Sequence, residues 1–280
     1  MISKICVAGA GTMGSGIALC AAQYGYTVTL FDLNETILEK AQNGNQKILE
    51  SMVSKERITS AEKDTIAASI TYTSDIQQCK ADLVIEAIVE KMEIKNALFE
   101  QLDKINSSNT IFASNTSSLS IDELQRNIPA PERVAGLHFF NPAHLMKLVE
   151  VVRASQTSEQ VVNLLIDFCK SLKKTPVVCK DAPGFIVNRV ARHYYLEAMR
   201  MVENGIADIE TIDRVMESAG FKMGPFKLMD LIGNDINLAV SQSLYDAFDQ
   251  EPRFQPSVVQ MEKVKKGELG KKTGKGFYQY

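Results

Sequence analysis

The sequence predicts an α/β domain built on a largely parallel sheet, followed by an all-helical domain. Up to about residue 180, short apolar runs rich in β-branched residues alternate with amphipathic helical stretches, which is typical of βαβ units. Beyond Asp181-Ala182-Pro183-Gly184, apolar residues recur only at helical spacing. The chain has 280 residues, a length at which one hydrophobic core usually divides into two. We therefore expect residues 1–182 and 183–280 to form separate domains.

The first domain opens with a buried strand at residues 2–8 that runs directly into glycines. Further strands are expected at 27–31, 70–72, 82–86, 110–113, 134–140, 148–152 and 175–179, because these runs are short, apolar and β-branched or aromatic. Helices are expected at 12–24, 34–57, 61–68, 91–105, 121–126 and 159–172. The later strands follow one another closely, which leaves room for antiparallel pairs among them.

The second domain is expected to begin as a helix at Pro183, because Asp181 and Pro183 are helix-start signals. Gly205 ends this helix. Later helices are expected at 208–217, 225–231, 236–248 and 257–266, and no strand is expected among them. The basic, glycine-rich segment at 270–278 is either a flexible end or a turn that folds back on a ligand.

Composition indicates a soluble globular protein and argues against a nucleic-acid binder. The chain is 45% hydrophobic and 23% charged with a formal net charge of −3, whereas nucleic-acid binding usually requires a basic surplus. The five cysteines form no CxxC pair and the three histidines no ligand pattern, so we expect reduced structural thiols and no metal site. Because neither a targeting segment nor a membrane-length apolar run is evident, we expect a cytoplasmic protein without a membrane span.

The sequence GAGTMG at residues 9–14 fits the GxGxxG pattern and lies between the first strand and the first helix. In this pattern Gly9 permits the tight turn, Gly11 lets the backbone approach a pyrophosphate, and Gly14 lets helix and strand pack closely. Thr12 and Met13 begin the helix, whose N-terminal N–H groups attract phosphates. The context predicts a Rossmann-like dinucleotide-binding domain. The alternative is a glycine turn that binds no ligand.

Asp32 ends the strand that follows this helix and favours NAD as the cofactor. A carboxylate at that position accepts hydrogen bonds from the adenine ribose hydroxyls and repels the 2′-phosphate of NADP. Leu33 and Asn34 follow, so no arginine stands ready to bind such a phosphate.

His138 and Glu150 are candidates for acid–base chemistry because each lies in an apolar run that reads as a strand. A buried carboxylate is costly without a partner, and adjacent strands would let Glu150 meet His138. In such a dyad the imidazole takes the proton of a substrate alcohol, while the carboxylate orients the ring. The alternative is a structural histidine beside an edge-strand glutamate.

Other polar residues carry weaker signals. Asn115-Thr116-Ser117-Ser118 follows a strand, where α/β folds bind ligands, although Ser118 and Ser120 more simply cap the next helix. Asn188 lies one turn into the expected Pro183 helix and could equally be a surface residue. The basic residues Lys40, Lys47, Lys55 and Arg57 are either a solvated face or a partner for an anionic ligand.

Together these segments resemble the 3-hydroxyacyl-CoA dehydrogenase family, and most closely its bacterial short-chain members, over essentially the whole chain. The resemblance depends on GAGTMGSGIA (9–18), ADLVIEAIVE (81–90), ASNTSSLSI (113–121), GLHFFNP (136–142), MKLVEVV (146–152), DAPGFIVNR (181–189), MGPFKLMD (223–230) and GKKTGKGFY (270–278). It implies a Rossmann-like domain plus a helical domain that usually forms a homodimer, with the active site in the cleft between them. It also implies NAD, an acyl-CoA substrate, and interconversion of 3-hydroxybutyryl-CoA and acetoacetyl-CoA.

The resemblance further implies a role for each matching residue. His138 matches the family's catalytic acid/base and Glu150 its partner. Ser117 matches a serine near the nicotinamide and the reacting oxygen, and Asn188 an asparagine that holds the substrate. Positions that match further cofactor contacts are Asp32, Glu90, Lys95, Asn141 and Lys275, and Lys55 aligns with a CoA contact.

The chain departs from the family where proline is common, at His144 and His193, which bears on loop shape and on acyl-chain preference. Two alternative functions stay open. One is a β-hydroxyacid dehydrogenase that acts on small free acids with a catalytic lysine. The other is a non-catalytic NAD-binding relative, because a fold does not guarantee activity.

Overall fold

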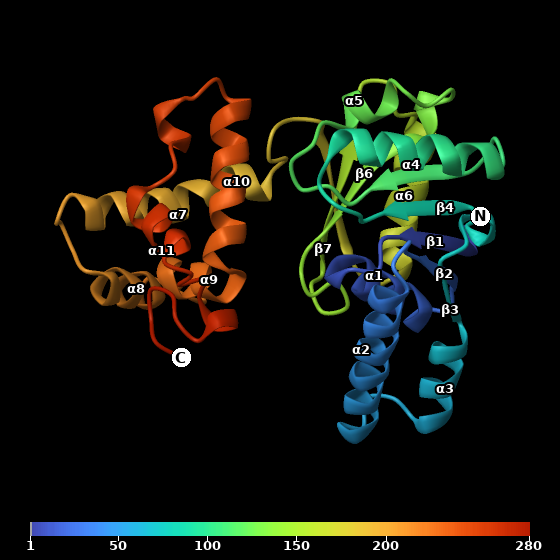
Figure 1. The fold of residues 1–280 in the computed structure, drawn as a ribbon, viewed down its shortest axis with the longest axis horizontal. Helices are drawn as coiled ribbons and strands as arrows, with labels where there is room; N and C mark the ends of the chain where they lie inside the picture. Colours follow the sequence, from blue (N-terminus) through green and yellow to red (C-terminus); the bar gives the residue numbers. More distant parts are fainter. Residues whose placement is uncertain (1) are drawn as a thin grey trace. The chain divides into compact units, whose positions relative to one another are not determined.

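The computed structural model describes residues 2–280 and divides the chain into two compact units, Met1–Ala182 and Pro183–Tyr280. The first unit is an α/β layer structure and the second is helical, so the predicted fold class is confirmed (Figure 1).

The first unit is organised around one eight-stranded sheet. Its strands are β1 (Lys4–Ala8), β2 (Thr27–Phe31), β3 (Ile70–Thr73), β4 (Leu83–Glu86), β5 (Ile111–Ser114), β6 (Val134–Phe139), β7 (Leu148–Arg153) and β8 (Thr175–Lys180), in the spatial order β3-β2-β1-β4-β5-β6-β7-β8. Adjacent strands are parallel except for β6 and β7, which form an antiparallel pair. The strand order reverses between β1 and β4, and ligands bind at such a switch point in open α/β sheets.

Helices cover both faces of this sheet. They are α1 (Thr12–Gln23), α2 (Glu35–Ser54), α3 (Ser60–Ala68), α4 (Met92–Ile105), α5 (Ile121–Gln125) and α6 (Glu159–Ser171), with short 3₁₀ helices η1 (Ile76–Gln78) and η2 (Pro131–Arg133). Alternate residues such as Ile5 and Val7 of β1 pack in one core with α1 and α6. On the opposite face Phe99 of α4 packs against Phe112 of β5, with ring centroids 5.5 Å apart.

Strand register places four polar residues on the face that carries Phe112. Glu86 of β4 is paired with Ser114 of β5, and Ser114 with Gly136 of β6. His138 lies two residues beyond Gly136 and therefore on the same face, and Glu150 of β7 stands directly opposite it. The sheet thus gathers Glu86, Ser114, His138 and Glu150 on one face.

The second unit consists of α7 (Val187–Glu203), α8 (Ile209–Ser218), α9 (Pro225–Ile232), α10 (Asn234–Ala247) and α11 (Val258–Lys265), with 3₁₀ helices η3 (Pro252–Phe254) and η4 (Lys271–Thr273). Its core contains Tyr195, Leu196, Ala198, Met199, Ile212, Phe226 and Met229. The predicted helix start at Pro183 is wrong. Gly184 and Phe185 have φ values of +72° and +49°, so the chain turns through left-handed backbone before α7 begins.

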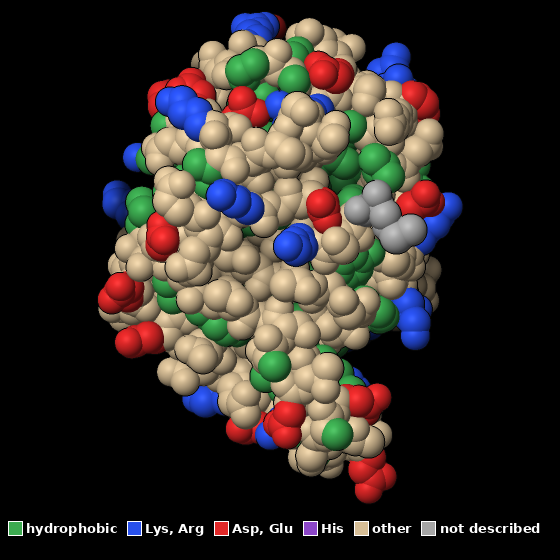
Figure 2. Space-filling view, turned by 90° about the vertical axis from the view of Figure 1, so that its right-hand side faces the viewer, with side chains coloured by type: hydrophobic (Ala, Val, Ile, Leu, Met, Phe, Trp, Pro, Cys, Tyr) green, Lys and Arg blue, Asp and Glu red, His purple; other side chains and the backbone are tan. Residues whose placement is uncertain are grey.

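The surface carries both signs of charge. On the face shown in Figure 2, basic and acidic side chains are interspersed over the surface, in keeping with the small net charge of −3. Among residues 2–280, no helix combines the length and the apolar character needed to span a membrane.

Candidate active site

The glycine turn after β1 is shaped by its own backbone. Gly9 has φ +106°, and a Cβ there would lie 2.5 Å from the carbonyl oxygen of Ala87, just after β4. A Cβ on Gly14 would lie 1.7 Å from the carbonyl oxygen of Gly9 and 3.3 Å from Val7. Gly14 therefore permits α1 to start against the turn itself as well as against the strand.

Gly11 leaves the outer side of this turn open. A Cβ built on it would meet nothing within 4 Å, and the residue is exposed. Gly11 is the N-cap of α1 and supplies no side-chain cap, so the N–H groups of the first turn, from Thr12 and Met13 onward, lie at an uncapped helix N-terminus. These features fit a pyrophosphate, which backbone N–H groups at a helix N-terminus bind well.

Asp32 is held beside this turn. Its Oδ2 accepts a hydrogen bond from the Ala10 N–H at 2.9 Å, and its Oδ1 accepts one from the Asn34 N–H at 2.9 Å. A carboxylate fixed in this way at the end of β2 suits the ribose of a dinucleotide. The glycine turn, the helix N-terminus and Asp32 together fit NAD.

We expect Asp32→Asn to narrow the preference for NADH over NADPH by about tenfold, because it removes a charge that repels a 2′-phosphate and keeps the side-chain shape. Parallel titrations with NADH and NADPH measure this ratio. Asp64→Asn, at an exposed position on α3, is the control and should leave the ratio unchanged. An unchanged ratio in the Asp32 variant would show that Asp32 does not face the ribose.

His138 and Glu150 are in direct contact. The Nδ1 atom of His138 lies 2.7 Å from Oε2 of Glu150, and their side chains are only 8% and 1% exposed. The antiparallel pairing of β6 and β7 puts the two residues opposite each other, as the sequence prediction required. Nδ1 faces the carboxylate, so Nε2 lies on the side of the imidazole ring away from Glu150. The ring of Phe140 packs against the imidazole at 4.5 Å between centroids.

A cluster of two acids and one lysine, Glu86, Glu90 and Lys95, lies at the carboxyl ends of β4 and β5; we call it the acid–lysine cluster. Lys95 Nζ is 2.6 Å from Glu86 Oε1 and 3.0 Å from Glu90 Oε2. Burial opposes ionisation of Glu90, but the Lys95 ammonium and the hydrogen bonds from Thr116, Lys95 and the Ser117 N–H outweigh it and lower the pKa of Glu90.

Sequence reasoning missed Glu86. It is fully buried, and its Oε2 accepts a hydrogen bond from Ser114 Oγ at 2.6 Å. The available signal was a carboxylate that closes the apolar run Leu-Val-Ile of β4, since such a group needs a buried partner.

The loop after β5 is bound to this cluster. The Ser117 N–H and the Ser118 Oγ each donate to Glu90 Oε1, at 3.1 and 3.3 Å. Ser118 is therefore not a helix cap, which corrects that prediction, whereas Ser120 does cap α5. Asn115 Oδ1 accepts from the Phe139 N–H at 2.8 Å and so ties this loop to the end of β6.

Asn141 is exposed just beyond β6 and precedes a cis peptide bond to Pro142. The next histidine, His144, is half-buried, and burial together with the Lys174 ammonium lowers its pKa. Lys55 is the exposed C-cap of α2. Lys40, Lys47 and Arg57 are exposed as well, as a solvated face requires.

In the second unit, Asn188 lies in the first turn of α7, which begins at Val187. The prediction that Asn188 lies one turn inside a helix beginning at Pro183 is therefore wrong. Burial and the charges of nearby arginines, first among them Arg253, lower the pKa of His193 farther along α7.

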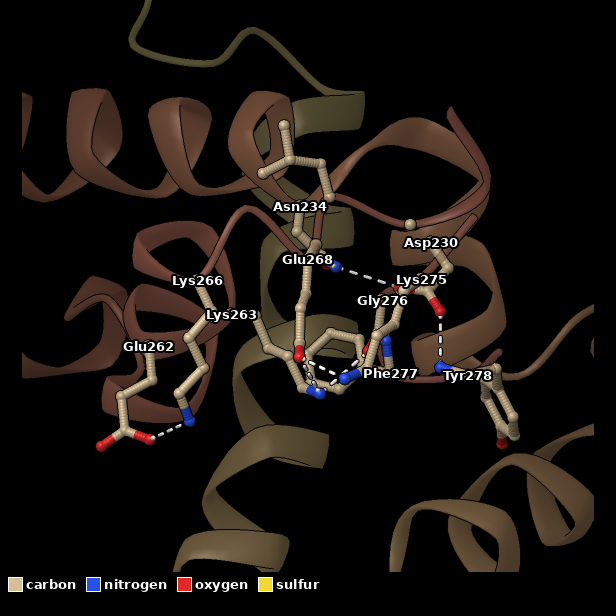
Figure 3. Close-up of polar contacts among 12 residues, drawn as sticks. Asp230, Asn234, Glu262, Lys263, Lys266, Glu268, Lys275, Gly276, Phe277 and Tyr278 are labelled. Atoms are coloured by element: carbon tan, nitrogen blue, oxygen red, sulfur yellow. Dashed lines mark hydrogen bonds and ion pairs between the residues drawn. The ribbon is translucent and has the colours of Figure 1, made fainter. Parts of the chain in front are cut away.

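Lys275 lies in a C-terminal turn that is folded rather than free (Figure 3). Buried Asp230 accepts hydrogen bonds from the N–H groups of Phe277 and Tyr278, both at 2.9 Å. The Lys275 ammonium is 2.6 Å from Glu268, which also binds Lys263 at 2.7 Å. The hydrogen bonds from Lys263 and then Lys275 lower the pKa of Glu268 to about 2.

Comparison with protein families covers both units. Residues 4–182 match the model described as 3-hydroxyacyl-CoA dehydrogenase, NAD binding domain, and residues 184–280 match 3-hydroxyacyl-CoA dehydrogenase, C-terminal domain.

Individual relatives agree with these models. The chain is 47% identical over 281 residues to a 3-hydroxyadipyl-CoA dehydrogenase of Escherichia coli, a match that covers 100% of this chain and 59% of that relative. It is 43% identical over 295 residues to the mitochondrial hydroxyacyl-coenzyme A dehydrogenase of Rattus norvegicus, covering 100% of this chain and 92% of the relative. The solved structure of an (S)-3-hydroxybutyryl-CoA dehydrogenase from Ralstonia eutropha superimposes with a TM-score of 0.95 at 37% identity, over 100% of this chain and 99% of that one.

Proposed function

This chain belongs to the 3-hydroxyacyl-CoA dehydrogenase family, and from that premise we propose that it interconverts (S)-3-hydroxybutyryl-CoA and acetoacetyl-CoA with His138 as the acid/base. Family membership makes the chain an NAD-dependent oxidoreductase of 3-hydroxyacyl-CoA substrates. The observation that carries the proposed chemistry is the buried contact of 2.7 Å between His138 Nδ1 and Glu150 Oε2.

His138 moves the proton in this reaction. NAD, when bound, would supply the acceptor for the hydride from C3 of the hydroxyacyl group. His138 Nε2 takes the proton of the C3 hydroxyl as the C3–O bond becomes a carbonyl, and returns it in the reverse direction. Glu150 keeps the Nδ1 proton in place and stabilises the imidazolium that forms.

The remaining roles rest on the matching positions of the family. Ser117 lies on the loop that the acid–lysine cluster binds, and we assign it to the substrate oxygen and the nicotinamide. Asn188 holds the substrate, and Lys55 binds the anionic end of CoA. The further cofactor contacts are Glu90, Lys95, Asn141 and Lys275.

A C4 acyl chain is supported by the Ralstonia relative, which is named for 3-hydroxybutyryl-CoA and has nearly the same length as this chain. The Escherichia coli relative is named for 3-hydroxyadipyl-CoA, so the C6 dicarboxylic substrate is the second candidate. The helical unit as a homodimerisation domain and a cytoplasmic location stay predictions from the sequence; a mitochondrial relative is among those matched.

The test is NADH consumption by the purified protein with acetoacetyl-CoA, with NADPH and 3-oxoadipyl-CoA in parallel. We expect rapid NADH-dependent reduction of acetoacetyl-CoA and a higher kcat/KM than for 3-oxoadipyl-CoA. A higher kcat/KM for the adipyl compound would overturn the chain-length assignment. Turnover of free 3-hydroxybutyrate would favour a β-hydroxyacid dehydrogenase. Binding of NAD without any turnover would indicate a non-catalytic protein.

A further inference from the structure

Glu86 is a buried carboxylate to which the reaction above assigns no role. Its Oε1 accepts hydrogen bonds from Lys95 Nζ at 2.6 Å and from the Ile88 N–H at 2.7 Å, and its Oε2 accepts one from Ser114 Oγ at 2.6 Å. These partners come from α4, from the segment after β4 and from β5. Glu86 thus joins the segment after β4 and helix α4 to the last residue of β5, at the sheet edge where α/β folds bind ligands.

The acid–lysine cluster carries one formal negative charge in excess, because two carboxylates share a single ammonium. Among residues 2–280, the ion pairs of Glu86 and Glu90 are with Lys95. Glu86 is fully buried and Lys95 is 1% exposed, so water screens these charges little. The Glu90 side chain is 39% exposed and carries the cluster's charge to the surface.

Stability alone does not explain such a cluster. Well-packed apolar side chains of similar volume usually stabilise a fold as well as a buried ion pair does, since desolvation offsets much of the Coulomb energy. The hydrogen bonds of Glu90 instead extend the cluster to the Ser117 loop.

We propose that Glu86, acting through Lys95, is a positioning residue for Glu90 and the Ser117 loop, and that the excess negative charge makes the protein bind oxidised NAD⁺ more tightly relative to NADH. The nicotinamide ring is cationic in NAD⁺ and neutral in NADH, so a nearby negative charge distinguishes the two forms. This inference rests on the proposed contacts of Glu90 and Lys95 with the cofactor.

The experiment is calorimetric titration of Glu86→Gln with NAD⁺ and with NADH, without substrate. The variant keeps the side-chain volume, and Lys95 retains Glu90 as a partner at 3.0 Å. We expect the ratio Kd(NAD⁺)/Kd(NADH) to rise by at least about fivefold, as expected for the loss of one poorly screened charge near the ring. Equal weakening of both forms would overturn the electrostatic part of the proposal.

A charge-restored variant separates charge from packing damage. Glu86→Gln combined with Lys95→Met removes one charge of each sign, so the cluster returns to a single negative charge on Glu90. We expect its ratio to lie within about twofold of the parent value, although both Kd values rise because a cofactor contact is lost. A ratio as high as that of the single variant would contradict the proposal. If the single variant does not fold, the double variant is compared with the parent protein alone. A ratio Kd(NAD⁺)/Kd(NADH) that differs from the parent value by fivefold or more would then contradict the proposal.

Asp82→Asn is the matched control. Asp82 directly precedes β4, while Glu86 ends it, so the two carboxylates lie about 13 Å apart along one strand. Asp82 accepts hydrogen bonds from the N–H groups of Ser3 and Lys4, which the amide oxygen can still accept. We expect an unchanged ratio. If Glu90→Gln alters cofactor binding while Glu86→Gln leaves the ratio unchanged, the proposed cofactor contacts stand and this inference falls. If neither variant alters binding, those contacts are wrong.

Discussion

Replacing His138 with glutamine is expected to lower kcat for acetoacetyl-CoA reduction by at least about a hundredfold, the usual contribution of a general acid/base. Glutamine keeps a polar side chain beside Glu150 but cannot exchange a proton at neutral pH. NAD⁺ affinity should change little, because the glycine turn and Asp32 are untouched. Steady-state rates with NADH, together with a calorimetric NAD⁺ titration, measure both quantities.

His193→Gln is the control for this prediction. His193 is an exposed histidine on α7, and its replacement should leave kcat within about twofold. A rate near that of the parent enzyme for His138→Gln would remove His138 from the chemistry. The buried pair with Glu150 would then be structural.

Replacing Gly14 with alanine is expected to lower the free energy of unfolding by about 3 kcal/mol or more and to abolish NAD⁺ binding. The added Cβ would lie 1.7 Å from the Gly9 carbonyl oxygen and 2.9 Å from the Gly9 carbonyl carbon, and backbone cannot yield as a flexible side chain does. Either the turn or the start of α1 must move. Urea denaturation with and without NAD⁺ measures the loss of stability and of ligand stabilisation.

Gly11→Ala is the comparison variant for Gly14→Ala. The Gly14 variant is expected to clash in the free protein, whereas the Gly11 variant is expected to clash only with bound ligand. Its Cβ would meet nothing within 4 Å, and the backbone of Gly11 (φ −64°, ψ −174°) suits alanine. We expect a stability loss below about 1 kcal/mol but a rise in the NAD⁺ Kd of roughly tenfold or more, because the methyl group occupies the approach to the pyrophosphate. Parent-like NAD⁺ affinity in this variant would show that the pyrophosphate does not pass Gly11. Parent-like stability of Gly14→Ala would contradict the described turn.

Much of the fold follows from local pattern in the sequence. β2 spans the predicted residues, and the other predicted strands and helices of the first unit are present with ends shifted by a few residues. Hydrophobic periodicity and the positions of glycines determine such strands and helices locally, so a single sequence is enough to predict them. The start of α7 was misplaced because Gly184 and Phe185 adopt left-handed backbone, which the helix-start signals at Asp181 and Pro183 do not report.

The candidate site could be predicted where a residue of a given type requires a partner because of where it lies in the sequence. The contact of His138 with Glu150 followed from a carboxylate within an apolar strand. Glu86 carried the same signal, a carboxylate at the end of an apolar strand, but its partners could not be identified, because Lys95 lies on the following helix and Ser114 meets Glu86 only through the parallel register of β4 and β5. Ser118 was assigned to a cap for the same reason, since its partner Glu90 is 28 residues away.

The antiparallel pairing of β6 and β7 has a consequence for folding and for tolerance to insertions. His138 and Glu150 are separated by only 12 residues, so the pair is encoded within a single hairpin and forms with low loop-closure entropy. Because both residues lie on neighbouring strands of one hairpin, their contact depends on the register of those two strands. A one-residue slip of β7 against β6 would turn the Glu150 side chain to the opposite face of the sheet, away from His138. Single-residue insertions or deletions within β6 or β7 should therefore separate His138 from Glu150, whereas changes of length in the connection between residues 139 and 148 can be absorbed by the loop as long as the register is kept.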